Sequence, residues 1–284
     1  MRAAPGDPAP LWRHSEVTAM FDCQADLDEV ARAVQEAFEL EAAPELRPVP
    51  VEDKDWVTHV QQLWEPLPLG SRFEVRLPWH PGPPGGEPLE AGRVGLRLEG
   101  GAAFGLGDHP TTQGAAAFLE RRVPALPAPR RVLDYGSGSG VLALAAAFLG
   151  ASTAVGVDVD ATSVASARRS AALNLQEGGS GPLVEFRRGP LGAEAARALA
   201  ASLAQEFGPF HLVVANILCR PLLELAPALA AALAPGGALG LTGLRGDLGD
   251  GARVRDAYAP YFESMREVPL DGGWLLVEAE RRRD

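Results

Sequence analysis

Residues Arg131-Val-Leu-Asp-Tyr-Gly-Ser-Gly-Ser-Gly140 are the strongest indicator of the fold of this chain. Its apolar beginning predicts a buried strand, and its three glycines predict a tight turn that opens directly into a helix over 141–149. A second apolar strand, 153–157, ends at Asp158, 22 residues after Gly136. An acid at that place can accept hydrogen bonds from both hydroxyls of a ribose. The chain is therefore predicted to carry a nucleoside-binding βαβ unit.

The spacing of the glycines indicates which nucleoside is bound. A dinucleotide fingerprint needs G-x-G-x-x-G, whereas here the third glycine comes one residue early, at Gly140. No lysine follows, so the loop is not a P-loop. A tight structural turn is the simplest alternative, but the strand, helix and acid in register favour a cofactor. G-x-G-x-G after a strand containing Asp134 resembles motif I of the class I S-adenosylmethionine-dependent methyltransferases. That resemblance implies S-adenosyl-L-methionine as cofactor and Asp134, Gly136, Gly138 and Gly140 at its site.

The rest of the second half predicts a doubly wound α/β sheet. The expected helices are 161–175 and 221–233, and the expected strands are 183–186, 210–215 and 238–244. Residues 264–270 and 274–280, around the turn 271–273, predict an antiparallel hairpin. A mostly parallel sheet ending in such a hairpin is what the class I methyltransferase fold would have, with its ligand at the carboxyl ends of the strands.

The first half predicts a small α+β domain and a linking region. The expected elements are strand 16–22, helix 27–39 with Asp26 as N-cap, strand 46–51, helix 53–63, and strands 72–77 and 93–98. The predicted division of the chain is a loose lead over 1–12, a small domain over 13–66, linking strands and a helix over 67–129, and the catalytic domain over 130–284.

Two further segments indicate the family. They are Ala103-Phe-Gly-Leu-Gly-Asp-His-Pro-Thr-Thr112 and Val214-Ala-Asn-Ile-Leu218. Together with Glu52-Asp-Lys-Asp-Trp56, they resemble the bacterial methyltransferases of large-subunit ribosomal protein eleven, the stalk-base protein. The resemblance runs from about Leu11 to the C-terminus. Leu106 and Asp108 stand where threonines are common in the family.

The resemblance implies a set of site residues. The family binds S-adenosylmethionine through residues that correspond here to Thr112, Gly136, Asp158 and Asn216, and Phe104 and Gly105 fall in the same cofactor segment. Asn216 is the expected catalytic residue, because its amide offers a hydrogen-bond acceptor and a donor beside the transferring methyl group.

The expected chemistry asks little of the side chains, because the methyl group of a sulfonium is already activated. The enzyme's task is in-line placement of a neutral amine and exclusion of water, so no dedicated base is required. His109 could act as a general base, but a His before Pro at a helix start more often anchors the loop. Ile217 and Leu218 follow Asn216 in place of a Pro-Pro-aromatic run, which favours a flexible aliphatic amine, a lysine or an N-terminus. The scattered histidines predict no metal site.

The first half also suggests a partner. Residues 16–65 hold 13 acids and three basic residues, nearly the whole net charge of −11. Charge alone is compatible with a solvated acidic surface. The resemblance, however, implies docking of the ribosomal protein by an N-terminal ferredoxin-like domain, and we expect this domain to be abbreviated here, without its first strand and helix. An acidic module would attract a basic ribosomal protein and repel bare RNA, so no direct binding of nucleic acid is expected.

Composition and alternatives complete the prediction. Apolar residues make up 46% of the chain, no apolar run is long enough to span a bilayer, and residues 1–10 lack the apolar core of a signal peptide. We therefore expect a cytoplasmic enzyme without a membrane partner, or an organellar one if a longer precursor exists. The alternatives are a methyltransferase of the same fold acting on another protein or a small amine, and a non-enzymatic cofactor-fold module.

Overall fold

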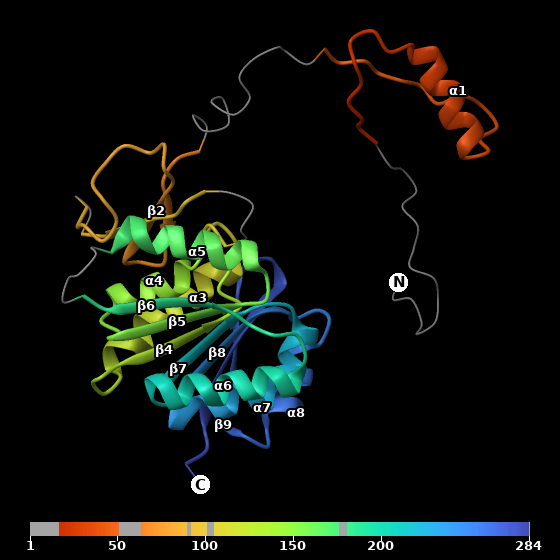
Figure 1. Ribbon diagram of the computed structural model, residues 1–284. Coiled ribbons are helices and arrows are strands. Elements are labelled where there is room, and N and C mark those ends of the chain that lie inside the picture. The colour runs from red at the N-terminus through yellow and green to blue at the C-terminus, as the bar shows by residue number, and fades with distance from the viewer. Residues whose placement is uncertain (1–16, 51–63, 90–91, 101–104, 176–180, 284) are drawn as a thin grey trace. The chain divides into compact units, whose positions relative to one another are not determined.

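The computed structural model describes residues 17–50, 64–89, 92–100, 105–175 and 181–283 (Figure 1). The chain divides into two compact units, residues 1–56 and residues 57–284. In the part of the chain that is described, no helix has the length and apolar character needed to cross a membrane.

The first unit contains one described helix, α1 (Leu27–Ala37), which confirms the predicted helix except for its last turn. The Asp26 carboxylate accepts the N–H groups of Asp28 and Glu29 at 3.0 and 3.1 Å, as expected of an N-cap. None of the residues of α1 is buried.

The prediction of two strands in this unit is wrong. Residues 17–22 and 46–50 form no strand, and the predicted helix over 53–63 lies outside the described residues. Alternating apolar residues favour a strand only where a second strand can pair with it and cover one face. The described residues of this unit, 17–50, contain no second strand, and the side chains of Val17, Met20 and Val49 are 88%, 85% and 78% exposed.

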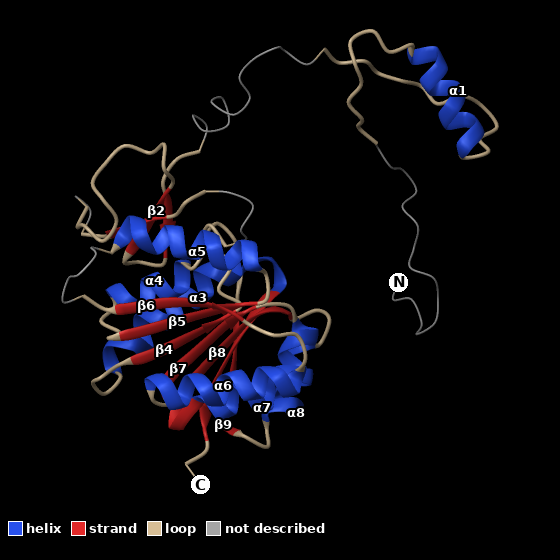
Figure 2. Cartoon of the chain, in the orientation of Figure 1, coloured by secondary structure: helices blue, strands red, loops and turns tan. Residues whose placement is uncertain are grey.

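The second unit is built on a seven-stranded sheet with the order β6-β5-β4-β7-β8-β10-β9 (Figure 2). The five strands β4 to β8 are parallel to one another, and β10 pairs antiparallel with both β8 and β9. This confirms the predicted doubly wound sheet with a C-terminal hairpin. The strands are β4 (Arg131–Tyr135), β5 (Thr153–Asp158), β6 (Leu183–Arg188), β7 (Phe210–Asn216), β8 (Leu233–Arg245), β9 (Phe262–Pro269) and β10 (Trp274–Arg281).

Six helices cover the two faces of this sheet (Figure 1). One face carries α3 (Pro110–Arg122), α4 (Val141–Phe148) and α5 (Ala161–Asn174), and the other carries α6 (Ala193–Phe207), α7 (Cys219–Ala232) and α8 (Asp250–Tyr258). Each face buries its own apolar cluster against the sheet. Because parallel strands end at one edge, the loops after β4, β5 and β7 come together there.

Two smaller features differ from or add to the prediction. Strand β8 begins at Leu233, five residues before the predicted start, and the register shift between the pairs of Phe210 and Leu212 accommodates the extra residues. A separate three-stranded sheet joins β1 (Leu67–Leu69) to the two strands predicted before the catalytic region, here β2 (Phe73–Arg76) and β3 (Val94–Arg97).

Candidate active site

The glycine loop between β4 and α4 has a backbone that only glycine adopts easily. The φ angles of Gly136, Gly138 and Gly140 are 85°, 50° and 84°, all in the left-handed region. The N–H groups of Gly136 and Ser137 both donate to the carbonyl oxygen of Val157, at 2.7 and 3.0 Å, which fixes the loop against β5. The motif therefore forms a rigid turn at the carboxyl edge of the sheet.

Asp158 ends β5 beside this loop, as the sequence predicts. Its Oδ2 accepts the N–H of Gly138 at 2.8 Å, and its Oδ1 accepts the N–H of Asp160 at 2.9 Å. A carboxylate oxygen has two lone pairs, so each oxygen can accept one further hydrogen bond. The half-buried carboxylate is thus oriented by the backbone and able to receive both hydroxyls of a ribose.

Asp134 lies beneath the loop and is fully buried. Its Oδ2 accepts the N–H of Ala143 at 3.1 Å, and among the described residues its Oδ1 has no hydrogen-bond partner. Burial raises the pKa of Asp134 to about 7, although the hydrogen bond from Ala143 opposes the rise. Asp134 therefore supports the first turn of α4 from below the loop.

Asn216 and Thr112 meet at the same edge of the sheet. Asn216 ends β7 and Thr112 lies in the first turn of α3, and the Asn216 Nδ2 donates to the Thr112 Oγ1 at 3.2 Å. The Thr112 side chain is buried, whereas Asn216 is half-buried. The fold thus brings together two predicted site residues that stand 104 positions apart in the sequence.

His109 is the N-cap of α3, which is the anchoring arrangement that the sequence favours. Its Nδ1 accepts the N–H of Thr111 at 3.3 Å and lies 2.7 Å from the Thr111 Oγ1. The His109 ring also meets the Trp274 ring edge-on, with centroids 4.8 Å apart. These contacts fix the start of α3, and with it the position of Thr112.

The segment before α3 reaches the glycine loop through a hydrogen bond. The Ser139 hydroxyl donates to the carbonyl oxygen of Gly105 at 2.8 Å. Phe104 lies outside the described residues. Ser139 is a residue that sequence reasoning missed, although its place between two loop glycines is a signal for such a contact.

A glycine outside the loop, Gly243, was also missed in the sequence, and it fixes the segment after Asn216. Gly243 in β8 has a φ of 84°, and a Cβ there would lie 2.2 Å from the carbonyl oxygen of Ile217. A Cβ on Gly136 would likewise lie 2.2 Å from the Ile217 Cγ2. Ile217 is therefore held between the glycine loop and β8. An isolated glycine inside a strand was the available signal for a close approach.

This arrangement fits a nucleoside-bearing cofactor better than a metal ion. The backbone of the loop is open to close approach, Asp158 presents two acceptors, and the buried Ser137 hydroxyl has no partner among the described residues. Among those same residues, no group of three His, Cys, Asp or Glu side chains could hold a metal ion.

Comparisons with known proteins agree with this geometry. The family model for ribosomal protein L11 methyltransferase (PrmA) matches residues 4–282. The ribosomal protein L11 methyltransferase of Nitrosomonas europaea is 36% identical over 287 residues, which cover 97% of this chain and 83% of that protein. The corresponding protein of Azotobacter vinelandii is 35% identical over 275 residues, with coverage of 96% and 84%.

A solved structure supports the same fold. The crystal structure of ribosomal protein L11 methylase from Lactobacillus delbrueckii subsp. bulgaricus matches with a TM-score of 0.60 and 28% identity. The match covers 77% of this chain and 100% of the other. Together with the strand order, it gives the second unit the class I methyltransferase fold.

Proposed function

Because the chain belongs to the ribosomal protein L11 methyltransferase family, and is thus a methyltransferase, we propose that it methylates amine nitrogens of ribosomal protein L11. The methyl donor in this proposal is S-adenosylmethionine. The observation that supports this proposal most directly is the hydrogen bond from Asn216 to Thr112, which joins the last residue of β7 to the first turn of α3 next to the glycine loop. This contact assembles the residues that the chemistry requires at one edge of the sheet.

The proposed cofactor site uses the groups at that edge. Asp158 would receive the ribose hydroxyls, the backbone at Gly136, Gly138 and Gly140 would lie against the nucleoside, and Thr112 would face the methionine end. Phe104 and Gly105 would complete the site, and Asp134 would support it from below. When bound, the cofactor supplies a methyl group on a positively charged sulfur.

Asn216 is the proposed catalytic residue because the structure orients its amide. Its Nδ2 donates a hydrogen bond to Thr112, which orients the amide group. Its Oδ1, the acceptor atom of that group, can then accept a hydrogen bond from a target amine. A lysine amine has a pKa of ~10.4 in water, and desolvation near an apolar wall favours its neutral, nucleophilic form. Ile217 provides such a wall directly after Asn216. These residues position and desolvate the amine without a separate base.

The acidic segment 16–65 is the proposed docking element for the substrate. In its described part, α1 carries two acids in its first turn and no basic residue in its last turn. The large apolar side chains of Val17, Met20, Phe38 and Val49 are more than 70% exposed in the same unit. Exposed apolar groups among acids suit a basic protein surface, whereas nucleic acid would be repelled. A substrate-docking domain over 13–66 is part of this proposal, without the strands of a ferredoxin-like sheet in its described residues.

A ribosomal protein as substrate also makes the cytoplasm the expected location, with an organelle as the alternative. Which amines of the substrate are methylated is set by how that protein presents them to Asn216.

The proposal is tested by incubating the full chain with labelled S-adenosylmethionine and purified ribosomal protein L11. The matched variants are Asn216→Ala and Arg220→Ala, the second being four residues away with an 89% exposed side chain. Label on L11 that is lost only in Asn216→Ala supports the proposal. Cofactor binding by calorimetry without label on L11 indicates another protein or a small amine as substrate. No cofactor binding at all indicates a non-enzymatic module.

A further inference from the structure

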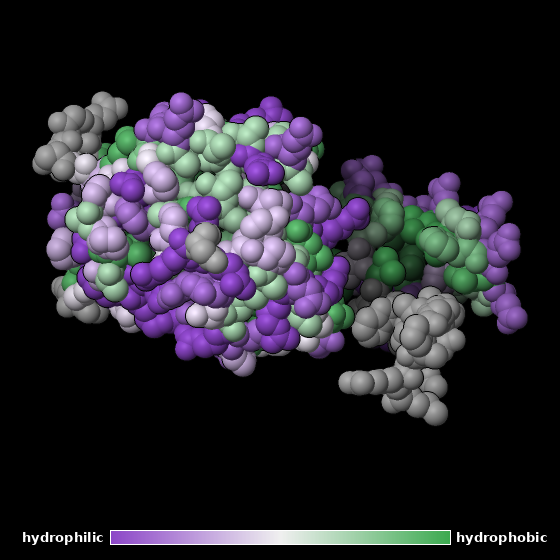
Figure 3. All heavy atoms as spheres, turned by 90° about the horizontal axis from the view of Figure 1, so that it is seen from below, coloured by the Kyte–Doolittle hydropathy of each residue, from purple (hydrophilic) through white to green (hydrophobic). Residues whose placement is uncertain are grey.

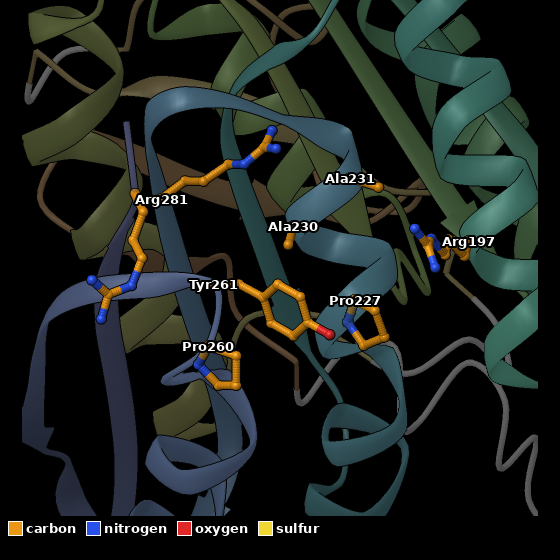
Figure 4. Close-up of a pocket in the computed structure, with 8 residues that line it drawn as sticks. Arg197, Pro227, Ala230, Ala231, Pro260, Tyr261 and Arg281 are labelled. Carbon is orange, nitrogen blue, oxygen red and sulfur yellow. The ribbon is translucent and has the colours of Figure 1, made fainter. Parts of the chain in front are cut away.

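The catalytic unit has a pocket of about 220 Å³ between α6, α7 and the end of β10 (Figure 4). Hydrophilic residues predominate on the side of the unit that carries α6 to α8 (Figure 3). In Figure 4 the side chains of Arg197 and Arg281 stay apart from each other, whereas a ligand site needs polar groups that converge. Converging polar contacts are found instead around the side chain of Gln113, at the start of α3.

The Gln113 amide forms hydrogen bonds with three backbone groups. Its Nε2 donates to the carbonyl oxygens of Gly107 and Pro68, at 2.5 and 2.7 Å. Its Oε1 accepts the N–H of Gly70 at 3.0 Å. Pro68 lies in β1 and Gly70 in the turn after it, whereas Gly107 belongs to the segment before α3. A carboxylate could not donate to the two carbonyls and an ammonium could not accept the N–H, so these partners together require an amide.

The segment before α3 joins two parts of the proposed cofactor site. At one end, the carbonyl oxygen of Gly105 accepts a hydrogen bond from Ser139 in the glycine loop. At the other end, His109 caps the first turn of α3. Gln113 holds the middle, because its amide donates to Gly107. The segment is thus fixed at three places, and Gln113 is the one that also connects it to β1.

Gly107 depends on its backbone for this attachment. Its φ is 110°, in the left-handed region that favours glycine. A Cβ there would lie 3.4 Å from the Val75 Cγ2 and 3.7 Å from the Leu69 Cδ1, so the buried backbone packs directly on β1 and β2. A glycine has no side chain with which to hold its place. The hydrogen bond from Gln113 therefore fixes a backbone position that packing alone leaves free to slide along the sheet.

Glu120 offers an internal comparison, because it connects the same helix to the same small sheet. Its carboxylate accepts the N–H groups of Ser71 and Arg72 at 2.9 and 2.8 Å, and the Ser71 hydroxyl at 2.7 Å. Glu120 and Gln113 thus each bond three groups of the sheet side. The partners of Glu120 all lie in the turn between β1 and β2, whereas one partner of Gln113 lies in the segment before α3.

We propose that Gln113 is a positioning residue for the methyl donor, because its amide holds the segment before α3 in the place that S-adenosylmethionine requires. This inference rests on the proposed function and assigns to Gln113 the affinity for the cofactor. Without the amide, the segment has to be ordered when the cofactor binds, and ordering a backbone costs free energy. The hydrogen bond from Asn216 to Thr112 does not involve Gln113, so the target amine keeps its place.

The test compares Gln113→Met and Gln113→Glu with Glu120→Ala, all in the full chain. Met keeps the length of the side chain without its hydrogen bonds, and Glu keeps only the acceptor. Calorimetry with S-adenosylhomocysteine should show an affinity about tenfold lower in both Gln113 variants, and within about twofold of the wild type in Glu120→Ala. The KM for S-adenosylmethionine should rise by the same factor while kcat stays unchanged. Thermal unfolding shows whether each variant is folded.

Hydrogen exchange of the protein without cofactor gives a second readout. The backbone amides of residues 105–109 should exchange faster in the Gln113 variants than in the wild type or in Glu120→Ala, because only the Gln113 variants release Gly107. Unchanged exchange in this segment would overturn the proposal even if a variant were destabilised as a whole.

The remaining outcomes distinguish this inference from the proposed function. Wild-type affinity for S-adenosylhomocysteine in both Gln113 variants would overturn the positioning role alone. An equal loss of affinity in Glu120→Ala would also overturn it, because the effect would then come from the attachment of the whole small sheet. A lower kcat with an unchanged KM for S-adenosylmethionine would do the same. A wild-type chain that bound no S-adenosylhomocysteine would refute both this inference and the proposed function.

Discussion

The two units of this chain use the same local rules and reach different degrees of burial. Helix α1 in the first unit and α5 in the second are both capped by an aspartate, Asp26 and Asp160, that accepts two backbone N–H groups. Helix α5 then buries six residues, whereas α1 buries none. Capping and amphipathic pattern therefore suffice to form a helix but do not decide whether it has a core. The buried core of the second unit is therefore where mutations should change stability, and capture of the substrate by the first unit is a proposal to be tested separately.

The largest effect is expected at Asn216. The change Asn216→Ala removes the amide that orients the amine and the donor to Thr112, and should lower kcat by about 100-fold or more, the range for a misplaced reacting group. Cofactor affinity should change less, because the glycine loop and Asp158 remain. Steady-state kinetics with calorimetry of cofactor binding would check this. A loss confined to the KM for the substrate would move Asn216 from catalysis to docking.

Gly243→Ala should have the next largest effect, because it pushes on Ile217 and therefore on Asn216. It combines an unfavourable φ with a clash against the Ile217 carbonyl, and should cost roughly 1–3 kcal/mol of unfolding free energy and lower kcat about tenfold. The matched control is Gly249→Ala, where φ is 74° and no atom lies within 4 Å of an added Cβ. Urea unfolding and turnover of both variants separate backbone strain from the clash. Equal kcat values in the two variants would contradict a positioning role for Gly243.

Because Asp134 is buried, we expect the free energy of unfolding of the second unit to depend on pH. Because its pKa in the folded state is raised to about 7, the folded protein still holds a proton that the unfolded chain releases from about pH 4 upward. The free energy of unfolding should therefore fall as the pH rises from about 4 to about 7, by up to about 1.4 kcal/mol per pH unit. In Asp134→Asn this contribution should disappear. Parallel slopes of wild type and variant, measured by urea unfolding across the window, would refute it.

The smallest effect is expected in the first unit. Glu36→Lys with Glu41→Lys should raise the KM for ribosomal protein L11 a few-fold at low salt, leave kcat unchanged, and lose its effect at high salt. The matched control reverses two exposed acids of the catalytic unit, Glu194 and Asp256. If both pairs raise the KM equally, only net charge matters and the first unit has no special docking role.

Much of the catalytic unit follows from its local sequence. The three loop glycines, the acid that ends β5 and the apolar strands between turn signals were enough to predict the parallel sheet and its C-terminal hairpin. Two helices, α6 and α8, were not predicted, although alanine has the strongest helix propensity and α6 is rich in it. The failure in the first unit is different in kind. Residues 17–22 have a strand-like pattern, but the described residues of this unit contain no strand that could pair with them.

The class of fold and the positions of Gly136, Asp158 and the cap of α1 follow from the amino-acid order alone, because each depends on contacts within a few residues or on a repeating pattern. The hydrogen bond from Asn216 to Thr112 and the enclosure of Ile217 by Gly243 and Gly136 depend instead on how the folded chain packs. Those contacts join residues from separate strands and helices. They exist only once the whole sheet has brought the ends of its strands together, and no local pattern records that geometry.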